Sequence, residues 1–171
     1  MGSSSVKTAT VLVRISLVAI MSALVAVATL LVRIPNPMGG YFNFGDVAIF
    51  AVALTFNPIV GGLAGGIGSA IADLIGFPVF AVPTLIIKGI EGLLAGLITS
   101  KKSIFRDSLA VCVAGCEMIF GYFFVELFLL GWGLGGALGE IPGNVAQIVI
   151  GAVVGVPVAY VVRRRLPEIL K

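Results

Sequence analysis

Residues 82–100, VPTLIIKGIEGLLAGLITS, carry Lys88 and Glu91 inside a run that is otherwise long and apolar enough to cross a bilayer. A membrane-spanning helix needs about 20 mostly apolar residues. A charged side chain that faces lipid at mid-membrane costs roughly 2.5 to 3.5 kcal/mol on insertion scales, so such residues usually face a bundle interior, a pathway or a ligand. The stretch predicts a membrane helix with an inward polar face. Asp73, Glu117 and Glu126 interrupt similar apolar runs.

The composition extends this prediction to the whole chain. Hydrophobic residues make up 59% and charged residues 11% of the 171 residues, whereas soluble domains have about 25% charged residues. The mean hydropathy is +1.18. We expect one all-α integral membrane domain over residues 1–171, located in the cell membrane, with no soluble domain that could hydrolyse ATP.

The residue types also limit the chemistry. The chain contains no histidine, so histidine metal sites and histidine acid–base catalysis are excluded, and we predict no cofactor and no metal. Cys112 and Cys116 are the only cysteines. Two thiols four apart on one helix face are poorly placed for a disulfide and too few for a metal site, so we interpret them as packing thiols.

Apolar runs separated by glycine, proline and charged residues divide the chain into six expected helices. They cover about residues 11–33, 46–56, 59–75, 82–100, 108–130 and 141–163. The second is too short to span about 30 Å at 1.5 Å per residue, so it is either a tilted partial span or extends into the neighbouring loop. Asp46 at its start suits an N-cap, whose side chain accepts hydrogen bonds from free backbone amides.

The basic residues indicate the orientation, because loops rich in Lys and Arg stay in the cytoplasm. With six crossings, nine of the 11 basic residues fall on one side: Lys7, Arg14, Lys101, Lys102, Arg106, Arg163, Arg164, Arg165 and Lys171. We therefore expect a six-transmembrane-helix bundle with both termini cytoplasmic, and we interpret the run 163–165 first as a topology anchor. This placement of the charges argues against a nucleic-acid partner.

Small residues recur at a spacing that brings helices together. Gly61, Gly65 and Ser69 are four apart and lead to Asp73, a pattern that lets helix backbones approach closely. Ala19 and Ala23 form a similar pair in the first expected helix. This alanine stripe either binds a partner helix or packs within the bundle.

Polar residues on three expected helices fall at similar depths. At 1.5 Å per residue, Lys88 lies about 9 Å and Glu91 about 14 Å below the outer end of the fourth helix. The fifth and sixth helices carry polar pairs in their outer halves, and the loops add polar and aromatic residues at the outer surface, among them Tyr41 and Glu140. The sequence thus predicts a pocket open to the outside, suited to a flat, polar, nitrogen-containing molecule. Its expected binding residues are Asn43, Lys88, Glu91, Tyr122, Glu126, Trp132, Asn144 and Gln147.

Structural explanations stay open for several of these residues. Lys88 with a glutamate also suits a structural ion pair, and Asn144 with Gln147 suits interhelical hydrogen bonding. Glu117 and Glu126 are nine residues apart, about 180° around a helix, so they cannot both face the pocket, and we favour Glu126. Asp73 falls near an outer helix end, where a carboxylate also serves as a cap.

Five segments, in this order, carry a family resemblance: YFNFGD at 41–46, FNP at 56–58 followed by the glycine-rich run to Asp73, KGIEG at 88–92, GYF at 121–123 with Glu126, and IPGN at 141–144 with Gln147. Together they cover nearly the whole chain. The chain resembles the substrate-binding S components of energy-coupling factor (ECF) transporters, most closely the branch associated with hydroxymethylpyrimidine or other small vitamin precursors.

The resemblance implies a function that does not involve catalysis. An S component binds a vitamin or precursor from outside and docks onto a membrane coupling (T) protein driven by two ATPase subunits. Hydroxymethylpyrimidine or a pyridoxine-like compound is the favoured substrate, with riboflavin next. Ala19 and Ala23 match the family's docking stripe, and the loop 34–45 would be the gate. The alternative is a solitary proton-coupled secondary transporter or facilitator, in which the intramembrane carboxylates carry protons.

Overall fold

The computed structural model describes residues 2–35, 40–100 and 103–166. In chain order its elements are α1 (Gly2–Leu31), β1 (Arg33–Pro35), β2 (Tyr41–Asn43), α2 (Gly45–Thr55), α3 (Pro58–Gly76), the 3₁₀ turn η1 (Pro78–Phe80), α4 (Ala81–Ile98), α5 (Ile104–Phe124), the π-helix η2 (Val125–Leu129), α6 (Gly133–Ile150), the π-helix η3 (Gly151–Gly155) and α7 (Val156–Arg165). Positions 36–39 of the expected gate, Lys101, Lys102, Lys171 and the side chain of Lys7 lie outside the described residues.

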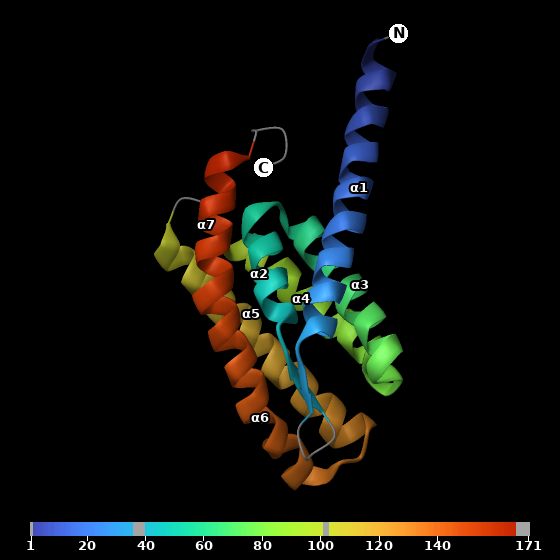
Figure 1. Ribbon diagram of the computed structural model, residues 1–171, viewed down its shortest axis with the longest axis vertical. Coiled ribbons are helices and arrows are strands. Elements are labelled where there is room, and N and C mark those ends of the chain that lie inside the picture. The colour runs from blue at the N-terminus through green and yellow to red at the C-terminus, as the bar shows by residue number, and fades with distance from the viewer. Residues whose placement is uncertain (1, 36–39, 101–102, 167–171) are drawn as a thin grey trace.

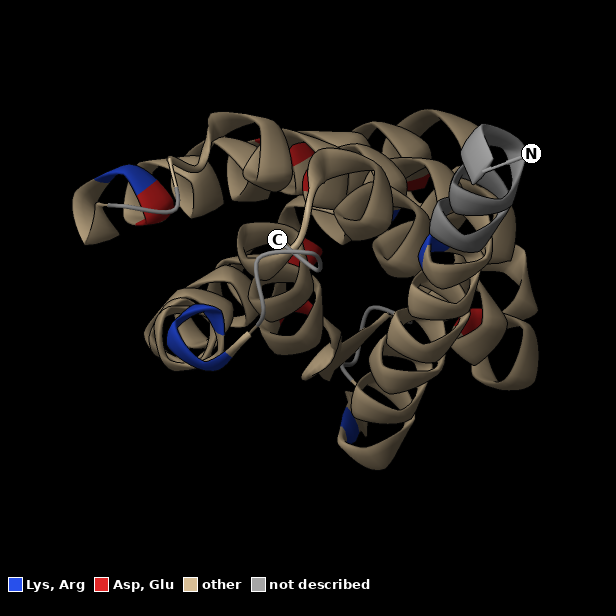
Figure 2. Cartoon of the chain, turned by 90° about the horizontal axis from the view of Figure 1, so that it is seen from above, with Lys and Arg blue, Asp and Glu red and all other residues tan. Residues whose placement is uncertain are grey.

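The predicted all-α membrane class is confirmed. Five helical segments of the described chain are long and apolar enough to cross a membrane, namely Val11–Leu31, Pro58–Gly76, Pro78–Ile98, Ile104–Leu129 and Gly133–Arg165, and α2 is a shorter apolar helix. Charged positions are sparse over the chain (Figure 2). Six crossings and cytoplasmic termini stay predictions.

The helices enclose α2 and lead to a small β-hairpin at one end (Figure 1). α1 packs on α3 and α2, α3 packs along α4, and α4 packs on α5. The start of α1 and the end of α7 lie at one end of the molecule, and the hairpin and the start of α6 lie at the other (Figure 1). Strands β1 and β2 pair antiparallel, with Arg33 opposite Asn43 and Pro35 opposite Tyr41. The sequence predicted a gate here but not this hairpin.

Helix α2 is short, as predicted, and lies at the centre of the fold (Figure 1). Nine of its 11 residues are buried, and its residues contribute to three hydrophobic clusters, through Phe50, Val52 and Ile49 among others. Its length is about 16 Å, about half of the hydrocarbon thickness. A helix this short is stable here because protein, not lipid, surrounds it.

Several predicted details at helix ends are wrong. Asp46 does not cap α2: Phe44 is at the N-cap position, and Asp46 lies in the first turn and pairs with Lys88. The last helical segment begins at Gly133, not near Ile141, because the glycine-rich stretch is helical and Pro142 lies inside α6. Gly131 and Gly133, with φ of 68° and 71°, form the turn before it, a conformation that glycine adopts without steric cost.

The interpretation of the two cysteines is wrong, and Arg163 has a contact that the sequence did not predict. Cys112 and Cys116 are exposed on α5 and do not pack in the interior. Arg163 is more than a topology anchor, because it is 7% exposed and forms an ion pair with Asp107, which is fully buried. Thr99 also donates a hydrogen bond to Asp107. This cluster fastens α7 to α5 at the end of the molecule away from the hairpin.

Helices α3 and α4 touch through glycine. A Cβ atom on Gly61 would lie 2.7 Å from the Cβ of Ala53 and 2.8 Å from the carbonyl oxygen of Gly92. A Cβ atom on Gly92 would in turn collide with the carbonyl oxygen of Gly61. The predicted role of the Gly61 stripe in close helix packing is confirmed.

We expect Gly61→Ala to lower the thermal stability of the protein in detergent, because the added methyl group meets backbone that cannot move aside. Overpacking of this kind costs roughly 1 to 3 kcal/mol. Gly143→Ala is the matched control, since nothing lies within 4 Å of a Cβ atom there. Equal melting temperatures for the two variants would contradict this account of the packing.

Candidate functional site

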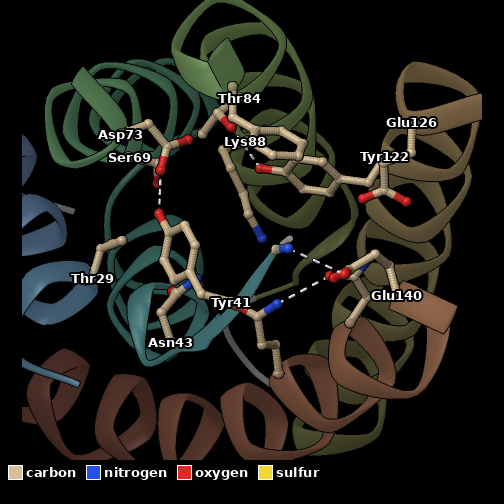
Figure 3. Close-up of a pocket in the computed structure, with 14 residues that line it drawn as sticks. Thr29, Tyr41, Asn43, Ser69, Asp73, Thr84, Lys88, Tyr122, Glu126 and Glu140 are labelled. Atoms are coloured by element: carbon tan, nitrogen blue, oxygen red, sulfur yellow. Dashed lines mark hydrogen bonds between the residues drawn. The ribbon is translucent and has the colours of Figure 1, made fainter. Parts of the chain in front are cut away.

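A polar pocket opens at the hairpin end, between the hairpin, α1, α3, α4, η2 and α6 (Figure 3). It contains about 460 Å³ of space free of protein atoms, a figure that includes open solvent at its mouth. Its lining residues are Thr29, Gly40, Tyr41, Asn43, Ser69, Asp73, Phe80, Thr84, Lys88, Tyr122, Glu126, Glu140, Asn144 and Gln147.

Lys88 reaches the pocket from α4 and is held by two carboxylates. Its Nζ pairs with Asp46 from α2 and lies 3.0 Å from a carboxylate oxygen of Glu91, one turn along α4. Lys88 is 3% exposed and Glu91 is fully buried. The ammonium group also lies 5.7 Å from the centre of the Tyr122 ring, a distance at which cation and ring attract. Lys88 therefore faces the pocket, and its positive charge is balanced by Asp46 and Glu91, which do not line the pocket.

The hairpin covers one side of the pocket and is fastened to α3. The Tyr41 hydroxyl donates a hydrogen bond to Asp73, and the Tyr41 ring stacks on Phe77 with 4.7 Å between ring centres. Burial, followed by the negative charge of Asp73, raises the pKa of Tyr41, so its hydroxyl stays protonated and able to donate. Arg33 adds a second link, because its guanidinium donates to the carbonyl oxygen of Ala72 over 2.6 Å.

A further contact fastens the hairpin to α6. The backbone N–H of Gly40 donates to a carboxylate oxygen of Glu140 over 3.3 Å (Figure 3). A Cβ atom at position 40 would collide with a carboxylate oxygen of Glu140, so a larger residue there would require the Glu140 side chain to shift. The hairpin thus bridges the pocket from α3 to α6.

Asn43 joins the hairpin to α2. Its side-chain oxygen accepts a hydrogen bond of 2.7 Å from the N–H of Gly45, the first residue of α2. A Cβ atom on Gly45 would lie 2.5 Å from the Thr29 hydroxyl oxygen and 2.7 Å from that Asn43 oxygen. Asn43 is 9% exposed, so its side chain has a structural bond as well as a place in the pocket lining.

The opposite wall comes from α5, η2 and α6. The Tyr122 hydroxyl lies 2.9 Å from that of Thr84, and Glu126 follows one turn later, at the start of the π-helix. On α6, the side-chain amide of Gln147 donates to the Asn144 oxygen over 3.1 Å. Glu126, Asn144 and Gln147 are each less than 9% exposed.

Six of the eight residues predicted to bind substrate line this one pocket, and the other two do not. Glu91 lies behind Lys88 as an ion-pair partner. Trp132 packs edge-on against Phe80, with 5.4 Å between ring centres, and so supports a lining residue. The choice between glutamates agrees with the geometry, because Glu126 lines the pocket and Glu117 does not.

Several lining residues lie outside the set predicted to bind substrate, although helical spacing identifies them. Thr84 precedes Lys88 by four residues, Ser69 precedes Asp73 by four, and Glu140 precedes Asn144 by four, so each lies on the same helix face as its partner. Glu140 was expected in a loop, but it lies within α6 and is 4% exposed. Thr29, at the end of α1, had no comparable signal.

We expect Tyr41→Phe to loosen the hairpin without removing the ring that stacks on Phe77. A hydrogen bond to a charged group contributes roughly 1.5 to 3 kcal/mol, so exchange of the backbone amides in β1 and β2 should accelerate about tenfold or more in hydrogen-exchange measurements. Tyr160→Phe is the control, because Tyr160 bonds Arg164 at the other end of the molecule. Unchanged hairpin exchange in Tyr41→Phe would show that Asp73 does not hold the hairpin.

Comparison with known proteins shows what this chain is similar to. Residues 10–164 match the family model of the ECF-type riboflavin transporter, S component. An uncharacterized protein of Pyrococcus woesei is 43% identical over 149 residues, which cover 86% of this chain and 99% of that protein. The thiamine precursor transporter HmpT of Lactococcus lactis is 31% identical over 154 residues, which cover 88% of each chain.

A solved structure of the S component of a bacterial ECF transporter has the same fold. It superposes with a TM-score of 0.65 at 23% sequence identity, and the match covers 92% of this chain and 97% of that one. With the family match over residues 10–164, these findings show that the chain belongs to the S components of ECF transporters, which are multi-pass membrane proteins and not enzymes.

Proposed function

We propose that this S component captures a small water-soluble vitamin precursor from outside the cell and delivers it through an ATP-driven coupling module. The observation that carries the proposal is the pocket itself, in which buried carboxylate, amide, hydroxyl and ammonium groups surround a space under a hairpin. A site with many polar groups and few aromatic rings suits a small heterocycle that forms several hydrogen bonds. The residues proposed to contact it are Asn43, Lys88, Tyr122, Glu126, Asn144 and Gln147.

Hydroxymethylpyrimidine or a pyridoxine-like compound is the proposed substrate, with riboflavin second. The 31% identity to a thiamine precursor transporter supports a single-ring precursor, and the family description supports riboflavin. Tyr122 and Phe80 offer ring faces or edges to a flat molecule, and the side chains of Asn144 and Gln147 offer amides to its edge. The hairpin is proposed to open for entry and to close over the ligand.

The proposed contact surface for the coupling protein lies on α1. Ala19 and Ala23 are exposed on the outside of the bundle, and small side chains let a partner helix approach closely. The two ATPase subunits would act through that coupling protein. The alternative, a solitary proton-coupled transporter, predicts uptake by this chain alone that an uncoupler abolishes.

The first experiment is to purify the chain alone in detergent, identify any bound small molecule by mass spectrometry and titrate that compound back. A stoichiometric pyrimidine, pyridoxine-like compound or flavin that binds with submicromolar affinity supports capture. Failure to bind any compound of a vitamin panel, with proton-dependent uptake by the chain alone, would support the alternative.

We expect Asn144→Ala to weaken binding of the identified compound by roughly 1 to 3 kcal/mol, because truncation leaves buried polar groups of the pocket and the ligand without partners. Isothermal titration of the purified chain measures this loss. Val145→Ala is the control, since Val145 is the next residue on α6 and is 42% exposed. Equal affinity in Asn144→Ala and Val145→Ala would remove Asn144 from the binding site.

We expect Ala19→Leu to leave binding by the isolated chain intact and to abolish uptake in cells that contain the coupling module, because the larger side chain holds the partner helix away. Val149→Leu, which adds a methylene group at a position on α6 that is 54% exposed, should leave both binding and uptake unchanged. Normal uptake in Ala19→Leu would place the docking surface elsewhere.

A further inference from the structure

The ionisable side chains around the pocket are unbalanced in charge. Among the described residues, Lys88 is the only basic residue that lines it, whereas three acidic residues do: Asp73, Glu126 and Glu140. Lys88 already has two ion-pair partners, Asp46 and Glu91, on the side away from the pocket. The single positive charge is therefore more than matched before any ligand arrives, and the formal charge around the pocket is negative.

This balance disfavours anionic ligands. A phosphate ester or a carboxylate would have to compete with Asp46 and Glu91 for Lys88 and would meet further acidic groups across the pocket. Like charges brought together in a poorly solvated site repel strongly. Lys88 keeps one N–H donor beyond the two that its carboxylates occupy, and this donor suits a neutral acceptor such as a ring nitrogen.

Of the three acidic residues that line the pocket, Glu126 has a buried carboxylate oxygen that accepts no hydrogen bond from the described residues. It is 3% exposed, and its Oε2 atom is buried without a hydrogen-bond partner among the described residues. None of the ion pairs found between described residues includes Glu126. A buried carboxylate oxygen with no donor is costly unless a ligand or water supplies one.

Gln147 supplies a second, independent observation. Its Oε1 atom is buried and lacks a donor among the described residues, whereas its amide nitrogen is used by Asn144. Gln147 is 4% exposed and lines the same pocket as Glu126. The wall formed by η2 and α6 thus presents two buried acceptor oxygens, and both require N–H or O–H donors.

We propose that Glu126 binds an amino or protonated ring-nitrogen group of the ligand, with Gln147 accepting a second N–H, so that the site takes neutral or cationic amino-heterocycles and rejects phosphate esters. The inference rests on the proposed capture function and narrows its substrate class. An aminopyrimidine fits the pattern, because it combines N–H donors for Glu126 and Gln147 with a ring nitrogen that accepts from Lys88.

Three probes separate the chemical requirements: hydroxymethylpyrimidine, which bears a 4-amino group, its 4-oxo analogue, and its phosphate ester. Titration of the full purified chain measures each affinity. We expect the amino compound to bind at least about tenfold more tightly than the oxo analogue, and the phosphate ester to bind more weakly than the amino compound by at least the same factor, the scale of one hydrogen bond to a charged group.

The variant Glu126→Gln tests the residue. It should weaken binding of the amino compound by about tenfold to a hundredfold and reduce or reverse the preference over the oxo analogue, because a glutamine amide donates to an oxo group. A merely structural role would weaken both compounds equally, and that result would overturn the proposal. Glu117→Gln is the control, because Glu117 lies nine residues earlier in the chain and outside the pocket lining.

Three further outcomes distinguish failure of this inference from failure of the proposed function. Submicromolar binding of riboflavin or pyridoxine that Glu126→Gln does not change would leave vitamin capture standing and overturn the role of Glu126. Binding of the phosphate ester as tightly as of its parent would also overturn the charge argument. If the wild-type chain binds none of these compounds or any vitamin of the panel, capture itself fails and this inference with it.

Discussion

Lys88, held between Asp46 and Glu91 in the interior of the bundle, is the interaction on which the rest of the arrangement depends. Each of the three charges would be very costly to bury alone, and removing one partner of a buried pair commonly costs about 3 to 5 kcal/mol. The pairing joins α2 to α4 and fixes the first turn of α2. Since α2 contributes residues to each of the three hydrophobic clusters of the described chain, the ion pair also helps to fix how α2 packs in the core.

The same ion pair influences which ligands the pocket accepts, because it balances the charge of Lys88. Because two carboxylates already balance its charge, Lys88 can donate a hydrogen bond to a ligand but is poorly suited to bind an anion. The selectivity of the pocket then depends on the other walls, where acceptor oxygens of α6 and η2 outnumber donors. Charges placed for stability below the site thus decide the chemistry of the ligand that the site can hold.

The sequence predicted the helices well, because apolar length and breakers mark spans clearly. It predicted the height of the site residues, since rise per residue converts sequence position into depth. It did not predict which face of α4 points into the pocket. Glu91 was therefore expected in the lining, although it lies behind Lys88 as an ion-pair partner. Strands of three residues are too short for an alternating pattern to be recognised, and a glycine-rich helix such as the start of α6 resembles a loop. Asp46 was predicted to be an N-cap because its actual partner, Lys88, lies 42 residues later in the chain, and local sequence patterns do not indicate such a distant contact.

The contacts that hold the hairpin to α3 and α6 affect how long a ligand stays bound more than how tightly it binds. Asp73 on α3 accepts a hydrogen bond from Tyr41, and Glu140 on α6 accepts one from the backbone of Gly40. Both bonds hold the hairpin in place. In the proposed capture cycle, weakening either bond would raise the rates of entry and of escape together, because both would pass through the same open state. The time for which a captured molecule stays in the pocket, and with it the time available for meeting a partner in the membrane, can therefore change during evolution through side chains that fasten the hairpin, with little change in the groups that recognise the ligand.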